Sequence, residues 1–187
     1  MKRVSFVGSS GAGKTTLAMA VAARIGVEHI ELDGIFHQAD WTQLPADEFV
    51  EQITARTNDA VKRTGGWTAD GNYNTQTAGL VQRLADTIVW IDTSKPRVMY
   101  RVIKRTLRRA ILREELWNGN REPWTNLYAW DPAKNIIRWA WTTHASTKAR
   151  YETMSSDGSW DHAEVVRLTT PTEVAAWLAA LGGPNPP

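Results

Sequence analysis

The sequence predicts an α/β fold in which a parallel β-sheet carries helices on both faces. Short apolar runs with strand character alternate along the chain with longer segments whose apolar residues recur at helical spacing. The first apolar run leads directly into a glycine-rich turn and then into a helical segment. A length of 187 residues, with 42% hydrophobic and 22% charged residues, suits one soluble domain with a sizeable core.

The glycine-rich turn has the spacing G-x-x-x-x-G-K-[ST]. Its residues are Gly8, Ser9, Ser10, Gly11, Ala12, Gly13, Lys14, Thr15 and Thr16. In this motif backbone N–H groups surround phosphates, the lysine reaches the β and γ oxygens, and the hydroxyl binds Mg²⁺. A predicted buried strand over 2–7 precedes the turn, and a helical pattern from Leu17 to Ile25 follows it. We therefore expect Lys14 to hold the transferred phosphate and Thr15 to contact the metal.

A second predicted strand, over 29–32, leads into Asp33. Residues just beyond the carboxyl ends of parallel strands face the ligand crevice of such a sheet, which makes Asp33 a candidate for the acceptor side. A plain turn aspartate beside Gly34 is the alternative, and this stretch alone does not separate the two. The segment 33–66, which includes a helix opening near Pro45, is expected to form the acceptor site.

A third short strand, over 67–69, ends in Asp70. A carboxylate at the end of a strand beside the phosphate loop can hold Mg²⁺ directly or through water, so we expect Asp70 to share the metal with Thr15. The run 75–85 predicts one helix. The run 87–91 predicts the fourth and most apolar strand.

A basic segment follows, and five of its arginines are spaced four residues apart. They are Arg97, Arg101, Arg105, Arg109 and Arg113. On a helix this spacing places the guanidinium groups on one face. With a phosphate loop in the same domain, Arg101 and Arg105 are interpreted as clamps on the transferring phosphates. A solvated face, or contact with nucleic acid, is the alternative for the stripe.

The remainder of the chain predicts a lid and three further elements. Residues 114–130 lack clean periodicity, which indicates a short lid over about 109–131. Helices are expected over 132–154 and from Pro171 to about Leu181, a fifth strand over 163–168, and a frayed tail over 183–187. The chain has ten tryptophans, five of them between Trp117 and Trp141, and we expect most of the ten in the core.

Composition excludes several classes of protein. The chain has no cysteine, which excludes disulfides and thiolate metal sites. No stretch has the character of a signal peptide or a membrane span, so we expect a cytoplasmic protein that does not bind membranes. We expect the protein to be a monomer or a homodimer. The formal net charge of +2 is too small to indicate nucleic-acid binding by itself.

With these residues in place, the chain resembles the adenylate-kinase-like group of P-loop nucleoside and nucleotide kinases over nearly its whole length. Within that group it is most similar to the bacterial DNA topology modulation proteins. The resemblance is carried by 8–16, Leu32-Asp33, Asp70-Gly71-Asn72-Tyr73, 101–105 and Trp117-Asn118-Gly119-Asn120-Arg121-Glu122. It implies a single kinase domain over 1–182, a five-stranded parallel sheet in the order 2-3-1-4-5, and a lid that closes on ATP.

The resemblance also implies roles for individual residues. Arg101 matches the lid arginine that lies over the adenine, Arg105 matches the one that reaches the phosphates, and Asp70 matches an aspartate that helps to position Mg²⁺. Two departures concern the acceptor. Asn74 stands where the Asp-Gly-Phe-Pro-Arg motif has its arginine, and residues 36–37 are Phe and His where an acceptor-site arginine is expected.

Both missing arginines bind the acceptor's phosphate in adenylate kinases, so a nucleoside or another small hydroxyl compound is favoured over AMP. Asp33 would then accept the proton of the acceptor's hydroxyl, as in small-metabolite kinases of this superfamily. The sequence thus predicts ATP- and Mg²⁺-dependent phosphoryl transfer to a small acceptor, a nucleoside or nucleotide, with a sugar-acid type of acceptor as an alternative. The rival from another class is a nucleotide-binding regulator that contacts DNA or RNA through its arginine-rich helix.

Overall fold

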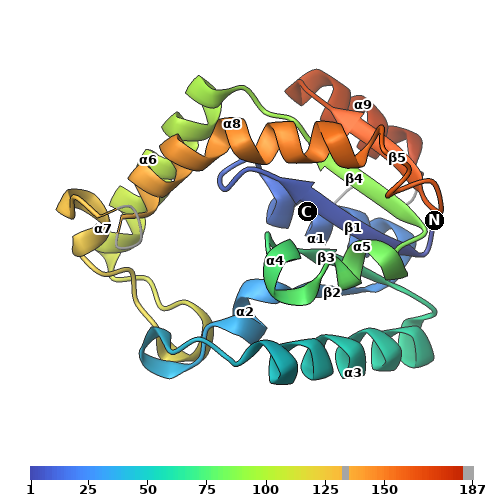
Figure 1. Ribbon diagram of the computed structural model, residues 1–187, viewed down its shortest axis with the longest axis horizontal. Coiled ribbons are helices and arrows are strands. Elements are labelled where there is room, and N and C mark those ends of the chain that lie inside the picture. Colours follow the sequence, from blue (N-terminus) through green and yellow to red (C-terminus); the bar gives the residue numbers. More distant parts are fainter. Residues whose placement is uncertain (132–134, 183–187) are drawn as a thin grey trace.

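The structure is a computed structural model that describes residues 1–131 and 135–182. Its centre is a five-stranded parallel sheet in the order β2-β3-β1-β4-β5 (Figure 1). The strands are β1 (Arg3–Gly8), β2 (Glu28–Glu31), β3 (Trp67–Asp70), β4 (Thr87–Ile91) and β5 (Glu164–Leu168). The predicted fold class and strand order are confirmed.

Helices cover both faces of the sheet and give the molecule three layers. On one face lie α1 (Lys14–Ile25) and α9 (Pro171–Ala180), and on the other lie α3 (Ala46–Thr64), α5 (Leu80–Leu84) and α8 (Ile136–Met154). Because successive side chains of a strand point to opposite faces, β4 serves both layers. Its Val89 packs with Leu17 and Val21 of α1, whereas Ile88 and Trp90 belong to the core beneath α3 and α8.

The prediction of a single helix over 75–85 is wrong. The chain forms α4 (Asn74–Thr77) and then α5, because Ala78 and Gly79 take positive φ values of 47° and 71° between them. Ala78 ends α4 in the left-handed region, and the change of direction brings Val81 and Ala85 into the core. The predicted start of the 132–154 helix and the predicted tail over 183–187 lie outside the described residues.

The basic segment forms a helix that lies beside α8. Helix α6 (Lys95–Leu112) packs on α8 through Val98, Val102 and Ala140. It is followed by η2 (Trp117–Gly119) and α7 (Thr125–Tyr128). Strand β2 leads into α2 (Leu32–Phe36) and η1 (Ala39–Trp41), and Figure 1 shows η2 and its flanking loop beside these two elements.

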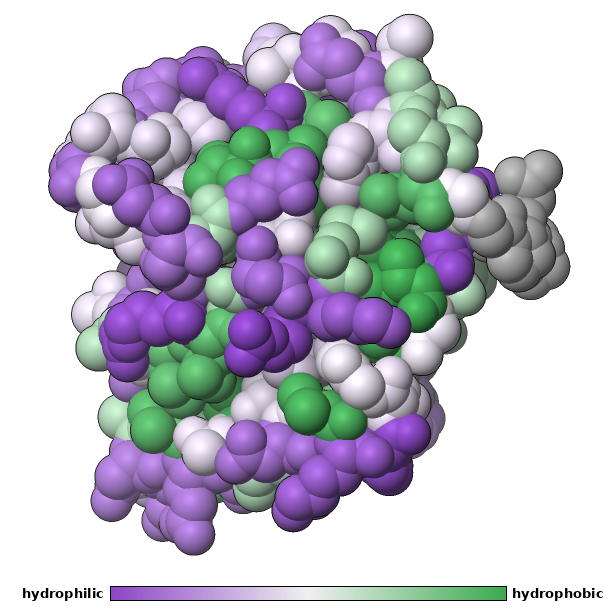
Figure 2. All heavy atoms as spheres, turned by 90° about the vertical axis from the view of Figure 1, so that its right-hand side faces the viewer, coloured by the Kyte–Doolittle hydropathy of each residue, from purple (hydrophilic) through white to green (hydrophobic). Residues whose placement is uncertain are grey.

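Within residues 1–131 and 135–182, no helix has both the length and the apolar character needed to cross a membrane. Figure 2 shows the right-hand end of Figure 1, where hydrophobic side chains lie in separate groups among hydrophilic ones.

Candidate active site

A pocket of about 1410 Å³ opens at the carboxyl ends of the strands. The last residues of four strands line it, namely Glu31, Asp70, Ile91 and Leu168. The glycine-rich turn, α2, the pocket-facing side of α6 and the segment after α6 supply much of the remaining wall, and residues of 71–76 and 169–178 contribute as well. This is the edge of an open parallel sheet at which ligands bind.

The glycine-rich turn has a backbone that side chains would obstruct. Gly8 and Gly13 have φ values of 145° and 105°, which L side chains rarely adopt. A Cβ on Gly8 would lie 2.5 Å from the carbonyl oxygen of Ile91, and one on Gly13 would lie 3.2 Å from Nη1 of Arg101. The loop therefore packs closely between β4 and α6, and its position at the start of α1 suits an anion.

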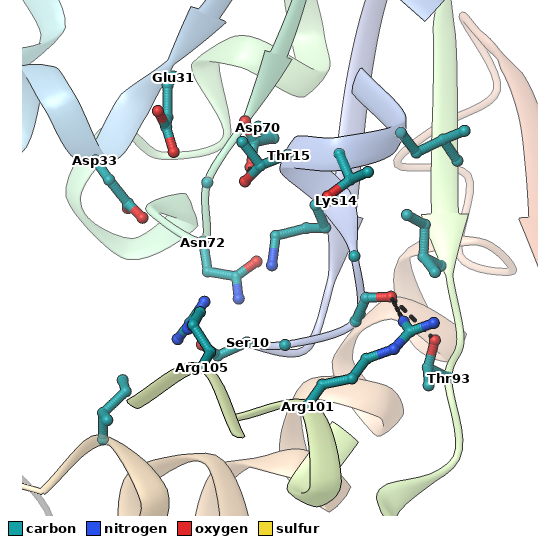
Figure 3. A pocket seen from close by; sticks show the side chains of 18 of the residues that line it. Ser10, Lys14, Thr15, Glu31, Asp33, Asp70, Asn72, Thr93, Arg101 and Arg105 are labelled. Carbon is teal, nitrogen blue, oxygen red and sulfur yellow. Dashed lines mark hydrogen bonds between the residues drawn. The ribbon is translucent and has the colours of Figure 1, made fainter. Parts of the chain in front are cut away.

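Lys14 is buried within this loop. Its Nζ donates hydrogen bonds to the carbonyl oxygens of Gly8 and Ser9, both at 3.0 Å. Burial lowers the pKa of Lys14, and the negative charges of Asp70 and Asp33 act against that shift. In Figure 3 the ammonium group extends into the space between the strand ends and Arg105.

Thr15 and Asp70 form a pair beside the lysine. Thr15 Oγ1 donates to Asp70 Oδ2 at 2.7 Å, and His29 Nε2 lies 3.3 Å from Asp70 Oδ1. That Oδ1 is buried and accepts no hydrogen bond within the described residues. The described part of the chain holds no cluster of three or more His, Asp or Glu residues that could bind a metal alone. One hydroxyl and one carboxylate fit Mg²⁺, which takes its other oxygens from phosphates and water.

Four of the five arginines in the predicted stripe line the pocket, and Arg113 does not, since it ends α6 in the left-handed region. Arg101 Nη1 donates to the carbonyl oxygen of Ala12 in the glycine-rich turn at 2.7 Å. Arg105 is largely buried, and its Nε has no hydrogen-bond partner within the described residues. Burial and the neighbouring charge of Arg109 lower the pKa of Arg105. Figure 3 shows Arg101 and Arg105 along the same loop as Lys14.

Asp33 lies on the opposite side of the pocket, in the first turn of α2. Its Oδ1 accepts a hydrogen bond from Tyr73 Oη at 2.6 Å, and His37 Nε2 lies 3.3 Å from the same hydroxyl. Burial and the charge of Asp33 raise the pKa of Tyr73, so the phenol stays protonated as a donor. Burial lowers the pKa of His37.

The segment predicted to be a lid contacts the acceptor segment. Trp117 Nε1 donates to Glu31 Oε2 at 2.9 Å. Asn118 Nδ2 donates to the carbonyl oxygen of His37 at 2.6 Å, and Asn120 Nδ2 donates to that of Gln38 at 2.8 Å. The backbone N–H of Trp41 donates in turn to Asn120 Oδ1 at 2.9 Å. These contacts fix residues 117–120 to the acceptor segment and hold Trp117, which lines the pocket, in place.

Three pocket residues, Glu31, Tyr73 and Trp117, are not predicted individually by the motifs. The sequence does hold a signal for Glu31. Like Asp70, which ends β3, it is the last residue of a parallel strand, and β3 separates its strand β2 from β1, which leads into the glycine-rich turn. Tyr73 follows Asp70 closely, but its contact with Asp33 spans 40 positions. The contact between Trp117 and Glu31 spans 86 positions and has no signal in the local sequence.

Kinases of known structure share this fold. A shikimate kinase from Acinetobacter baumannii in complex with shikimate aligns with a TM-score of 0.53 and 15% identity, over 97% of this chain and 90% of its own. An unliganded sugar kinase from Janibacter sp. HTCC2649 aligns with a TM-score of 0.53 and 16% identity, over 96% of this chain and 93% of its own. No protein-family model matches the chain, and no curated protein sequence matches it. The fold is that of P-loop kinases, and the resemblance to the bacterial DNA topology modulation proteins stays a prediction.

Proposed function

We propose that this protein is an ATP- and Mg²⁺-dependent phosphotransferase that moves the γ-phosphoryl group of ATP to a hydroxyl of a small acceptor. The observation that carries this proposal is that the glycine-rich turn and Asp33 line one pocket. Lys14 lies between them, and the negative charge of Asp33 acts on its pKa. A phosphoryl donor and an acceptor must meet at such a point, and positioning and charge stabilisation supply most of the rate.

The donor half of the pocket fits ATP with Mg²⁺. The N–H groups of residues 8–16 would surround the β and γ phosphates, and Lys14 would neutralise the transferring group. Thr15 and Asp70 would hold Mg²⁺, which offsets the negative charge of the phosphates when it is bound. The unsatisfied Nε of Arg105 and the guanidinium of Arg101 stand on the facing helix, where bidentate donors suit phosphate oxygens.

The acceptor half is built around Asp33. Its carboxylate would accept the proton of the attacking hydroxyl, while Tyr73 holds one of its oxygens in place. Nucleosides and nucleotides remain the first acceptor class. A sugar-like hydroxyl compound is supported by the two similar structures, a shikimate kinase bound to shikimate and a sugar kinase. The rival proposal, DNA or RNA binding through the arginine stripe, is weakened because Arg101, Arg105 and Arg109 line the pocket.

The test is release of ADP that depends on one small acceptor. Acceptors are first chosen by thermal shift with Mg²⁺ and a non-hydrolysable ATP analogue, since a ligand of the native state raises its melting point. We expect Lys14→Ala to abolish acceptor-dependent ADP release. Lys62→Ala, on the exposed side of α3, is the matched control and keeps wild-type turnover.

Asp33→Asn separates the two halves of the pocket. We expect this variant to lose phosphoryl transfer while it still binds MgATP, because the carboxylate serves the acceptor and not the donor. Wild-type turnover in Lys14→Ala would contradict the proposal. Weakened MgATP binding with normal turnover in Asp33→Asn would contradict the acceptor-side role of Asp33.

A further inference from the structure

We infer that the acceptor carries no negative charge and presents hydroxyl or amine hydrogens to Glu31 and Asp33, with Glu31 as the residue that rejects anions. This inference rests on the proposed function and narrows its substrate class. It excludes nucleotides and sugar acids as acceptors, and it retains nucleosides, polyols and amino-substituted polyols.

In the half of the pocket that would bind the phosphoryl acceptor, the free hydrogen-bonding groups are mainly carboxylate oxygens, which accept hydrogen bonds. Within the described residues, Glu31 uses one carboxylate oxygen for Trp117 Nε1 and Asp33 uses one for the hydroxyl of Tyr73. The other oxygen of each carboxylate accepts no hydrogen bond from the described protein atoms. Figure 3 shows both carboxylates directed into the same space. An ionised carboxylate only accepts hydrogen bonds, so a ligand between them must donate.

The positively charged side chains around this space are engaged elsewhere and do not offer a binding site for an anion. Arg109 lies 3.8 Å from Glu122, whose side chain is 7% exposed, and Lys14 and Arg101 are bonded to carbonyl oxygens of the glycine-rich turn. Within the described residues no ion pair joins Glu31 or Asp33 to a lysine or an arginine. The charge of Arg105 acts on both carboxylates and that of Lys14 acts on Asp33, but under the proposed function both cations face the donor phosphates. An anionic acceptor would therefore add a third negative charge beside Glu31 and Asp33.

The pKa of Glu31 is raised, which agrees with an excess of negative charge in this part of the pocket. Burial is its largest cause, and the charges of Asp70 and Asp33 raise it further, whereas the hydrogen bond from Trp117 lowers it. The site thus already disfavours negative charge at the position that the acceptor would approach.

Aromatic rings complete the walls of the acceptor half. Trp117 packs over Gly34, where a Cβ would lie 2.9 Å from Cδ1 of the indole, so the missing side chain lets the indole reach Glu31. His37 stacks beside Trp117 with ring centroids 6.3 Å apart, and Trp41 packs edge-on against His37 at 5.3 Å. Such walls suit the apolar faces of a base or sugar ring, or an ammonium group.

The test uses pairs of acceptor probes in which one member carries an anionic group that the other lacks. Adenosine with AMP, and methyl shikimate with shikimate, are titrated into the protein saturated with Mg²⁺ and a non-hydrolysable ATP analogue, and Kd is measured by calorimetry. We expect the uncharged member of a pair to bind about tenfold more tightly or better, the ratio for one unfavourable charge at a few ångströms in a partly solvated site.

Glu31→Gln keeps an oxygen for Trp117 and removes the charge, so it should reduce that ratio about tenfold. Glu115→Gln removes the same charge from an exposed position on the loop that carries Trp117 and should leave the ratio as in the wild type. Tighter binding of an anionic member, an unchanged ratio in Glu31→Gln, or no binding of any probe would overturn the inference. A separate titration with MgATP alone tests the proposed function, so the two can fail independently.

Discussion

Each of three carboxylates at or just beyond the strand ends is held by one neutral donor. Thr15 donates to Asp70, Tyr73 to Asp33, and Trp117 to Glu31. A neutral donor fixes the orientation of a carboxylate without cancelling its charge. Each carboxylate therefore keeps its charge for a ligand, and each has been oriented before the ligand arrives, which is how preorganised sites lower a barrier.

The pair of Tyr73 and Asp33 gives a test at this scale. Tyr73→Phe removes the 2.6 Å hydrogen bond and frees Asp33 to rotate away from the attacking hydroxyl. We expect kcat to fall about tenfold, the effect of losing one hydrogen bond to a charged group, with KM for ATP unchanged. Steady-state kinetics with the acceptor from the thermal-shift screen measure both constants.

Tyr128→Phe is the control for this substitution, because Tyr128 is 73% exposed on α7. It should leave both constants at their wild-type values. An unchanged kcat in Tyr73→Phe, or a rise in its KM for ATP, would show that Tyr73 does not orient Asp33 for the acceptor.

At the scale of elements, the loop around η2 is fixed to α2 and η1 by two asparagines. Asn120 is 4% exposed and bonds both the carbonyl oxygen of Gln38 and the N–H of Trp41. Asn118 bonds the carbonyl oxygen of His37. The two short elements that border the acceptor half are therefore held together by polar contacts, and no apolar core residue lies in η1 or η2. Such contacts open at a lower free energy than the packed sheet.

Asn120→Asp tests whether this loop closes the acceptor half. The substitution keeps an oxygen for Trp41 but places a buried carboxylate against the carbonyl oxygen of Gln38. We expect faster amide hydrogen exchange over 115–121 and 38–43, unchanged exchange in the sheet, and a KM for the acceptor raised about tenfold.

Asn58→Asp, exposed on α3, makes the same chemical change away from the pocket and should alter neither exchange nor KM. If Asn120→Asp instead raised KM for ATP and left that of the acceptor unchanged, the loop would belong to the donor half, as the lid prediction implies.

At the scale of the molecule, the sequence predicts those features that depend on neighbours along the chain. The strand, turn and helix around Gly8 to Thr16 are local, and the positions of Asp33 and Asp70 follow from their places after strands of a parallel sheet. The break at Ala78 and Gly79 is not predicted, because packing of Val81 and Ala85 decides it. Contacts such as Trp117 with Glu31 join distant segments and depend on the finished fold.

The tryptophans show the same limit. The expectation that most of the ten lie in the core is wrong: Trp67, Trp90 and Trp160 are buried, whereas Trp124, Trp130 and Trp141 are 51%, 82% and 57% exposed. Two of these indoles pack under cations, with Arg138 and Lys95 each 3.6 Å from a ring centroid. Aromatic composition does not distinguish such surface pairs from core packing.

The central claim is that the glycine-rich turn binds a magnesium nucleoside triphosphate, and calorimetric titration of the purified protein with Mg²⁺ and a non-hydrolysable ATP analogue tests it most directly. The account predicts saturable binding at one site in the wild type and in Lys62→Ala, and at least about a hundredfold weaker binding in Lys14→Ala, since a buried charge contact to phosphate is lost. Absence of binding in the wild type, or equal binding in Lys14→Ala, would contradict it.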